Sequence, residues 1–306
     1  MFRRFAGHHL KVWHYFNHLL GAPGYSPYVW FSRDSLLDET NPWLHTPERI
    51  LRSRDDVDPS IVFLSGMDWH ALPESARGRS GLPVINLIQS LQHTFRDDPR
   101  SELLASRAIR ICVTPELTEL LAGTGRVNGP LFTIPAAIDF DDLTAAAPEG
   151  EREIDVLVAA LKNPRLGQAL HDGLSSPRRK VEVLSELVPR REFLSLLRRA
   201  RVTVFLPEPV EGLYMPALEG MALGTLVVCP DVYSNRSFCV PSVNCFRPAY
   251  EEQAIVEAAE EALAFLPSAG EMLSRARQTA RERDMRQERA AFLEILDDVD
   301  QIWAGG

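Results

Sequence analysis

Short apolar runs alternate with amphipathic stretches along the second half of the chain. Four of these runs, rich in β-branched residues, predict buried strands at 154–160, 180–184, 202–206 and 225–229. Between them, residues 190–200 place their apolar side chains on one side of a helix. Strands that are separated by helices pair in parallel through right-handed crossovers. The pattern therefore predicts a doubly wound α/β sheet in this half.

The first half of the chain has a less regular pattern, which is nevertheless typical of an α/β unit. Strands are predicted at 28–31, 61–64, 83–87, 109–113 and 131–134, and helices at 7–20, 101–107 and 115–122. Residues 143–153 are small or charged and contain Pro and Gly, which is typical of a linker. We therefore expect two domains that meet near residue 145.

From residue 250 onward the chain is predicted to be mostly helical. Its apolar side chains recur at helical spacing, at Phe292, Ile295, Leu296, Val299, Ile302 and Trp303. We interpret this stripe as core packing.

Composition narrows the class of protein and its compartment. The 306 residues, 45% apolar and 25% charged, are typical of a soluble globular protein of two domains. No apolar run approaches the roughly 18 residues of a membrane-spanning helix. His8, His9 and Lys11 interrupt the apolar stretch that a signal peptide would need. The four cysteines are too few for a disulfide scaffold, and we expect a reducing cytoplasm.

Charge and metal-ligand spacing exclude two kinds of partner. The net charge is −9, and residues 251–306 hold 13 acids against 6 arginines, which disfavours a nucleic-acid surface. Neither the cysteines nor the eight histidines show the spacing of a metal site, so no metal is expected. A peripheral contact with a membrane stays open.

The densest chemical signal is the segment Leu-Pro-Glu-Pro-Val-Glu-Gly-Leu-Tyr-Met-Pro-Ala-Leu-Glu-Gly at 206–220. It follows a predicted strand, places Glu211 in a loop, begins a helix near Pro216 and places Glu219 one turn inside that helix. Ligands of open α/β sheets bind at the carboxyl ends of strands, and a helix N-terminus offers unpaired amides to a phosphate.

The two glutamates indicate a binding site only when they are considered together. Glu211 alone would be interpreted as a solvated loop acid, and Glu219 alone as a charge that stabilises the helix start. Together they can accept hydrogen bonds from hydroxyls at both ends of a nucleotide-sugar, beyond a phosphate held by the amides of Gly212, Leu213 and Tyr214. The segment therefore predicts a nucleotide-sugar site.

These residues resemble a known family. Glu211-x7-Glu219, in its setting of Gly, Pro and small residues, resembles the E-x7-E segment of retaining glycosyltransferases of the GT-B fold, in the large family-4-like group. The resemblance is close over about 202–229, and weaker similarities cover 111–121, 132–139 and 244–250.

The resemblance implies a fold of two Rossmann-like domains that face each other across a cleft. The N-terminal domain, 1–145, would hold the acceptor, and the C-terminal domain, 146–285, would hold the nucleotide-sugar. A C-terminal helix, at about 286–304, would cross back to the N-terminal domain. The glycines of the family's acceptor loop correspond to Gly7, before which a first strand would be expected in only six residues.

The resemblance also implies roles for single residues of the donor domain. Glu219 would bind the donor ribose and Glu211 the hydroxyls of the donor sugar, while the amides of Leu213 and Tyr214 hold sugar or phosphate oxygens. A basic pair usually follows the first strand of this domain and neutralises the leaving diphosphate. The corresponding cations are Lys162 and Arg165, although their spacing is closer than the usual one and each alone would be a surface charge.

Three further candidates lie in loops after predicted strands. His93 corresponds to a family histidine that contacts the donor sugar or the acceptor, and the alternative is a surface histidine. Asn235 and Arg236 follow the strand at 225–229 and could reach the sugar or diphosphate, with a solvated loop cation as the alternative for Arg236.

The expected function is a metal-independent transfer of a sugar, with retention, from a nucleotide-diphosphate donor to a glycan, lipid-linked or small-molecule hydroxyl. No other cofactor is expected. Two alternatives stay open, a nucleotide-sugar epimerase of the same fold and a non-catalytic binding protein. A dinucleotide-dependent oxidoreductase is rejected, because the glycines at 123–129 follow a helix rather than a strand and have the wrong spacing.

Overall fold

The computed structural model of the protein describes residues 7–72, 81–141, 143 and 151–305. It divides the chain into two compact units, one of residues 1–136 with 286–306 and one of residues 137–285. The predicted linker at 143–153 falls mostly on residues outside the described ones, as does any strand before Gly7. Among the described residues, no helix is long and apolar enough to cross a membrane.

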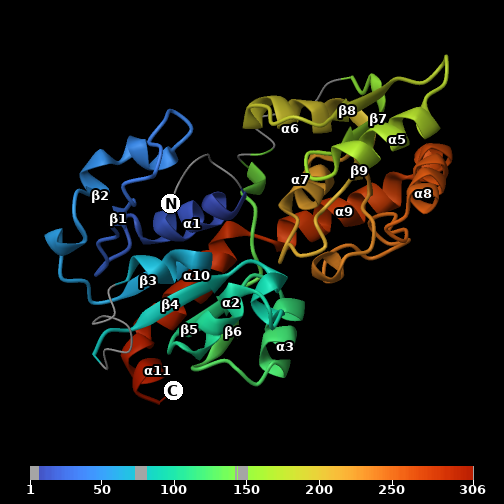
Figure 1. The fold of residues 1–306 in the computed structure, drawn as a ribbon. Helices are drawn as coiled ribbons and strands as arrows, with labels where there is room; N and C mark the ends of the chain where they lie inside the picture. Colours follow the sequence, from blue (N-terminus) through green and yellow to red (C-terminus); the bar gives the residue numbers. More distant parts are fainter. Residues whose placement is uncertain (1–6, 73–80, 142, 144–150, 306) are drawn as a thin grey trace. The chain divides into compact units, whose positions relative to one another are not determined.

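Unit 1 contains a four-stranded parallel sheet in the order β3-β4-β5-β6 (Figure 1). Its strands are β3 (Val62–Ser65), β4 (Val84–Ile88), β5 (Ile109–Cys112) and β6 (Leu131–Thr133). β4 and β5 are buried along their whole length, as expected of central parallel strands. The four strands predicted here are therefore confirmed.

The helices of unit 1 come from both ends of the chain. They are α1 (Gly7–Leu19), α2 (Pro99–Glu102), α3 (Pro115–Gly123), α10 (Met285–Asp297) and α11 (Val299–Gly305). The predicted apolar stripe is divided between α10 and α11, and Phe292 and Trp303 on it are buried. Its interpretation as core packing is confirmed.

Two predictions in the first half are corrected in detail. The strand expected at 28–31 is only β1 (Val29–Trp30), which pairs with β2 (Ile50–Leu51) in a separate small sheet. The helix expected at 101–107 ends early, because the chain tightens into a 3-10 turn at Leu103–Ala105.

Unit 2 contains a second four-stranded parallel sheet, in the order β10-β9-β7-β8. Its strands are β7 (Ile154–Ala159), β8 (Val181–Leu184), β9 (Ala200–Phe205) and β10 (Leu226–Val228). The chain runs outward from β7 to β8, and then returns past β7 to form β9 and β10. A topological switch point therefore lies between β7 and β9, where open α/β sheets bind their ligands.

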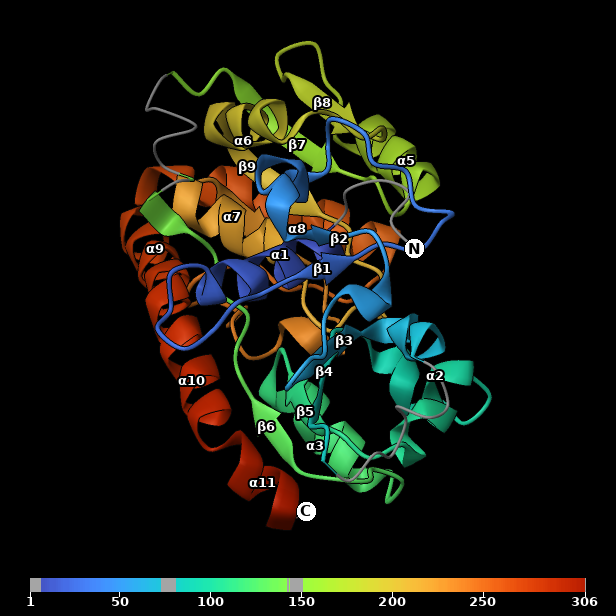
Figure 2. The same cartoon turned by 90° about the vertical axis from the view of Figure 1, so that its left-hand side faces the viewer.

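Helices cover both faces of this sheet (Figures 1 and 2). They are α5 (Pro164–Leu174), α6 (Arg190–Arg199), α7 (Met215–Leu223), α8 (Glu252–Phe265) and α9 (Gly270–Glu282). One core cluster joins the sheet to α6, α7 and α9, and a second joins it to α5 and α8. The doubly wound α/β architecture predicted for this half is therefore confirmed.

Candidate nucleotide-sugar site

The candidate site lies at the carboxyl ends of β9, β7 and β8 in unit 2. β9 leads into the loop that holds Glu211, β7 is followed by Lys162, and β8 is followed by the start of α6 at Arg190. Since these three strands are neighbours and parallel, their carboxyl ends meet at one edge of the sheet.

Glu211 and Lys162 form an ion pair across the switch point. Lys162 Nζ lies 3.4 Å from Glu211 Oε1, and the amide of Glu208 donates to Glu211 Oε2 at 2.9 Å. Burial raises the pKa of Glu211, and the positive charge of Lys162 opposes that rise. The charge of Lys162 is therefore partly balanced by Glu211, a pairing that the sequence did not predict.

Glu219 lies in the first half of α7 and is 2% exposed. Its Oε1 forms an ion pair with Nη2 of Arg190 at 2.9 Å. The arginine side chain is 43% exposed, so one partner is enclosed and the other faces water. A buried carboxylate is stabilised by such a cation, because it would otherwise lose its hydration without compensation.

The segment between Glu211 and Glu219 offers the amides that the sequence predicted. Gly212 is buried, Leu213 is half-buried and Tyr214 is 5% exposed at the N-terminus of α7. Among the described residues, the amides of Leu213 and Tyr214 have no hydrogen-bond acceptor. They lie at the positive end of α7, where an anionic oxygen is stabilised.

Arg165 is not joined to this group by any side-chain hydrogen bond or ion pair among the described residues. It is exposed in the first turn of α5, and within the described part of the chain it forms no ion pair. Its predicted role in neutralising a diphosphate stays a prediction.

Asn235 requires a correction. It is fully buried in the 3-10 turn Tyr233–Asn235, and its side-chain nitrogen donates to the Pro230 carbonyl at 2.9 Å and to Cys229 Sγ at 3.2 Å. The side chain satisfies the loop's own backbone and does not face outward toward a sugar.

Arg236 lies at the surface of the same loop. Its Nε and Nη2 donate to the two carboxylate oxygens of Asp231, at 3.0 and 2.8 Å, and its guanidinium lies 5.4 Å from the ring centre of Tyr233. The two-pronged pair holds the pKa of Asp231 below its usual value. Arg236 is thus an exposed loop cation with a carboxylate partner, and a role at the sugar or diphosphate stays a prediction.

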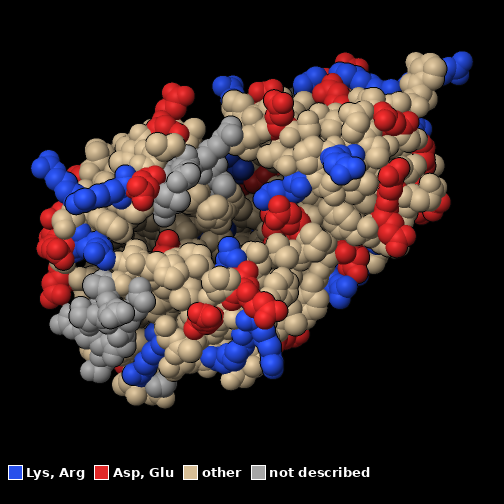
Figure 3. All heavy atoms as spheres, viewed as in Figure 1, with Lys and Arg blue, Asp and Glu red and all other residues tan. Residues whose placement is uncertain are grey.

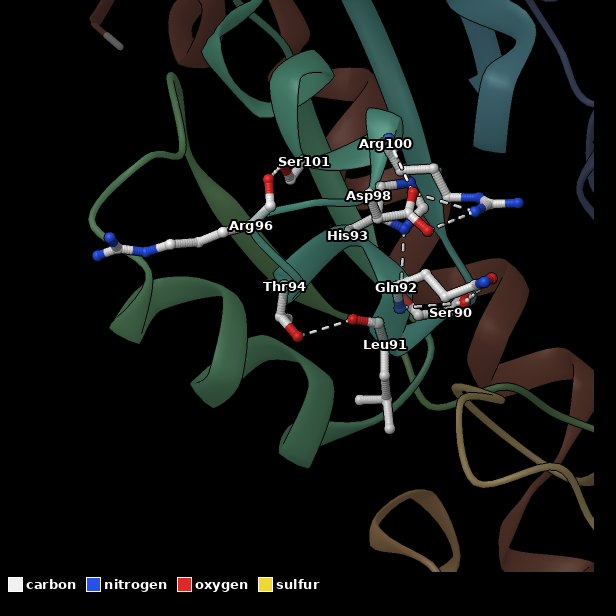
Figure 4. A network of polar contacts seen from close by, with 9 residues as sticks. All are labelled: Ser90, Leu91, Gln92, His93, Thr94, Arg96, Asp98, Arg100 and Ser101. Carbon is white, nitrogen blue, oxygen red and sulfur yellow. Dashed lines mark hydrogen bonds and ion pairs between the residues drawn. The ribbon is translucent and has the colours of Figure 1, made fainter.

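His93 belongs to unit 1, where it follows β4 on the 3-10 turn Leu91–Thr94 (Figure 4). It is 2% exposed, so the alternative of a surface histidine is wrong, and so is an outward-facing ligand contact in this conformation. The ring Nδ1 lies 3.1 Å from the Ser90 carbonyl, and Nε2 has no partner among the described residues. Burial lowers the pKa of His93 to about 4.

Arg190 is the site residue that the sequence analysis missed. The helical pattern located it only as the first residue of an amphipathic helix. The available signal was its position directly after a parallel strand next to β7. Its partner Glu219 lies on α7, and the contact depends on the packing of α6 beside α7.

Neither surface charge nor a cluster of metal ligands points to a further site among the described residues. On the face shown in Figure 3, basic and acidic side chains are interspersed over the described residues. Across the described ranges, no three His, Cys, Asp or Glu side chains lie close enough to hold a metal ion.

Comparisons with known proteins identify the fold. No protein-family model and no curated protein matches the sequence. Among solved structures, sucrose-phosphate synthase from Thermosynechococcus elongatus is similar at a TM-score of 0.59 and 14% identity, over 81% of this chain and 74% of that one.

Two other solved structures contain a nucleotide. A mutant of TarM from S. aureus, in complex with UDP and other ligands, is similar at a TM-score of 0.56 and 13% identity, over 71% of this chain and 51% of TarM. HepE from Anabaena, in complex with UDP, is similar at a TM-score of 0.57 and 15% identity, over 71% of this chain and 72% of HepE. The chain thus has the Rossmann-like fold of GT-B glycosyltransferases and spans about half the length of TarM.

Proposed function

We propose that this protein is a glycosyltransferase that moves a sugar from a nucleotide-diphosphate donor to a hydroxyl group. The observation that carries the proposal is the group of acids, cation and amides at the switch point of unit 2. It joins Glu211, Lys162 and Glu219 with the amides of Leu213 and Tyr214 at the carboxyl ends of neighbouring strands.

Each group has a separate task in this proposal. Glu219 accepts hydrogen bonds from the donor ribose, and Glu211 accepts them from hydroxyls of the donor sugar. The amides of Leu213 and Tyr214 hold oxygens of the diphosphate, with the dipole of α7 behind them. Lys162, together with Arg165 and Arg236 of the same unit, stabilises the negative charge that builds on the leaving diphosphate.

The finer parts of the proposal follow from the resemblance of the sequence. Transfer occurs with retention and without a metal, and the leaving phosphate helps to take the acceptor proton. The acceptor is a glycan, a lipid-linked sugar or a small hydroxyl compound bound by the N-terminal domain. All four cysteines are buried free thiols, which supports a cytoplasmic site of action.

A binding experiment followed by product analysis tests this function. A ligand that binds only the folded protein raises its melting temperature, so UDP, GDP, dTDP and ADP and their sugars are compared by thermal shift. Glu219→Ala is expected to weaken binding of the active nucleotide by about tenfold or more, the cost of lost hydrogen bonds to a charged group. Glu261→Gln, an exposed acid late in α8 and outside the site, serves as the control.

Incubation with the donor alone and with candidate acceptors then separates the reactions. Transfer to an acceptor, with release of the nucleoside diphosphate, supports the proposal. A rearranged donor without acceptor would indicate an epimerase. Failure of every nucleotide to bind would leave a non-catalytic protein of the same fold.

A further inference from the structure

Glu219 is held by one of its two carboxylate oxygens. Oε1 lies 2.9 Å from Nη2 of Arg190, whereas Oε2 has no polar partner within the described parts of the chain. The pair therefore leaves one acceptor oxygen available, at the edge where three strands end.

The two residues come from different elements that the fold fixes independently. Glu219 lies on α7, all but one of whose residues are buried, and this helix packs against both the sheet and α6. Arg190 is the first residue of α6, after a proline at 189 that restricts the backbone there. Arg190 reaches a buried carboxylate from a half-exposed position, so its guanidinium joins the surface to the carboxylate of Glu219.

We propose that Arg190 is a positioning residue of the donor site. It holds Oε1 of Glu219, and so fixes the carboxylate in the orientation in which Oε2 accepts a hydrogen bond from a ribose hydroxyl. This inference rests on the proposed function, because it requires that Glu219 binds the ribose of a nucleotide. It adds to the site a residue that lies outside the segment Glu211-x7-Glu219, and it explains why that residue is an arginine.

Arginine suits this task for a physical reason. Its planar guanidinium keeps a fixed geometry against a carboxylate, whereas the ammonium of lysine is a point charge on a flexible stem. Positioning of this kind adds affinity by reducing the orientational freedom that is lost on binding. Removal of Arg190 is therefore expected to affect the recognition of the ribose more than the recognition of the diphosphate.

The test compares ribonucleotides with their 2′-deoxy counterparts by calorimetry. UDP, GDP and ADP are each titrated beside the 2′-deoxy form, into wild type, Arg190→Ala, Arg190→Lys and Glu219→Ala. For the nucleotide that binds wild type, Arg190→Ala is expected to weaken binding of the ribonucleotide by about tenfold. The ratio of the affinities for the ribo and deoxy forms is then expected to be close to 1. Arg190→Lys is expected to recover part of the affinity and part of the ratio.

A matched control lies next along the same helix. Arg191 is exposed, has the same charge and makes no contact with Glu219, so Arg191→Ala is expected to bind as wild type does. Thermal unfolding of each variant without ligand separates loss of positioning from loss of the fold, and Arg190→Lys keeps the test open if Arg190→Ala unfolds.

The outcomes distinguish this inference from the proposed function. If no nucleotide binds wild type, the proposed function fails and this inference fails with it. If wild type binds and Glu219→Ala does not, while Arg190→Ala keeps the wild-type affinity and ratio, only the positioning role is overturned. Tighter binding by Arg190→Ala would also overturn it, because Arg190 would then occupy the place of the ribose.

Discussion

The imidazole of His93 is buried. Its Nδ1 has a hydrogen-bond partner, whereas its Nε2 has none among the described residues. Because Nδ1 lies within hydrogen-bond distance of the Ser90 carbonyl, an oxygen that can only accept, this nitrogen must carry the proton. Burial lowers the pKa to about 4, because the charged ring would lose its hydration. The neutral ring therefore presents an unprotonated Nε2 to the interior of unit 1 at neutral pH.

We predict that His93 stays neutral from pH 8 down to about pH 5, in a single tautomer with the proton on Nδ1. Nitrogen chemical shifts of the ring measure both properties, and the spectrum of His93→Gln identifies the signals. A ring that titrates near the ordinary value of 6.5 would show that the side chain is open to water.

The charge of Glu211 gives a second prediction at this scale. Its pKa is raised above the ordinary value of 4.5 by burial, with Lys162 opposing the rise, so protonation begins at a higher pH than for an exposed glutamate. A protonated carboxyl loses an acceptor for sugar hydroxyls. We therefore expect the acid limb of kcat/KM for the donor to have its midpoint above 4.5.

Two variants check the assignment of that limb. Glu211→Gln is expected to reduce activity and to remove the limb, whereas Glu261→Gln, at an exposed position on α8, is expected to keep both the activity and the limb. The same limb in Glu211→Gln would assign the titration to another group.

At the scale of elements, the close approach of α7 to β9 depends on a residue without a side chain. A Cβ at Gly220 would lie 2.7 Å from Cζ and 2.9 Å from Cε2 of Phe205, which is itself fully buried. Alanine normally favours a helix over glycine by up to about 1 kcal/mol, but here the added methyl group overpacks the core.

We predict that Gly220→Ala lowers the free energy of unfolding by about 1–3 kcal/mol, because α7 must move away from the sheet. Because α7 carries Glu219, nucleotide affinity is expected to fall as well. Gly123→Ala is the control, since a Cβ at that helical glycine meets no atom within 4 Å and is expected to be neutral or stabilising. Urea denaturation measures the free energy of unfolding of both variants.

The elements that the sequence could predict are those whose own residues determine them. The strands of both sheets were located because buried parallel strands are continuous apolar runs, as in 154–160. β2 and its pairing with β1 were not predicted, since the two residues of β2 give no periodicity. Arg190 was missed and Asn235 was misassigned for a related reason. Their roles depend on partners in other segments or on the path of a loop, which local pattern does not contain.

At the scale of the whole molecule, unit 1 depends on an ionic contact between distant parts of the chain. Lys11 and His18 on α1 both bind the carboxylate of Glu288 on α10, with His18 Nε2 at 2.9 Å from Oε1. All three residues are at most 4% exposed. Desolvation lowers the pKa of Lys11, and the charge of Glu288 opposes this. Figure 2 shows the two helices within this unit.

We predict that Glu288→Leu destabilises unit 1 by about 3–5 kcal/mol, because the lysine charge stays buried without the carboxylate of Glu288. The double variant Lys11→Met with Glu288→Leu is expected to recover much of that loss, since an apolar pair replaces the ions. Amide hydrogen exchange on β4 and β5 measures the stability of this unit. A double variant as unstable as Glu288→Leu would show that the charges themselves do not determine the effect.

The return of residues 286–305 to unit 1 has a consequence for synthesis on the ribosome. Unit 2 is continuous in the chain, so it can fold as soon as residue 285 has left the exit tunnel. Unit 1 lacks Glu288, which binds both Lys11 and His18, until translation delivers α10. Its early strands and its aromatic side chains are exposed for that interval, so the unit that begins earlier in the chain is completed after the other.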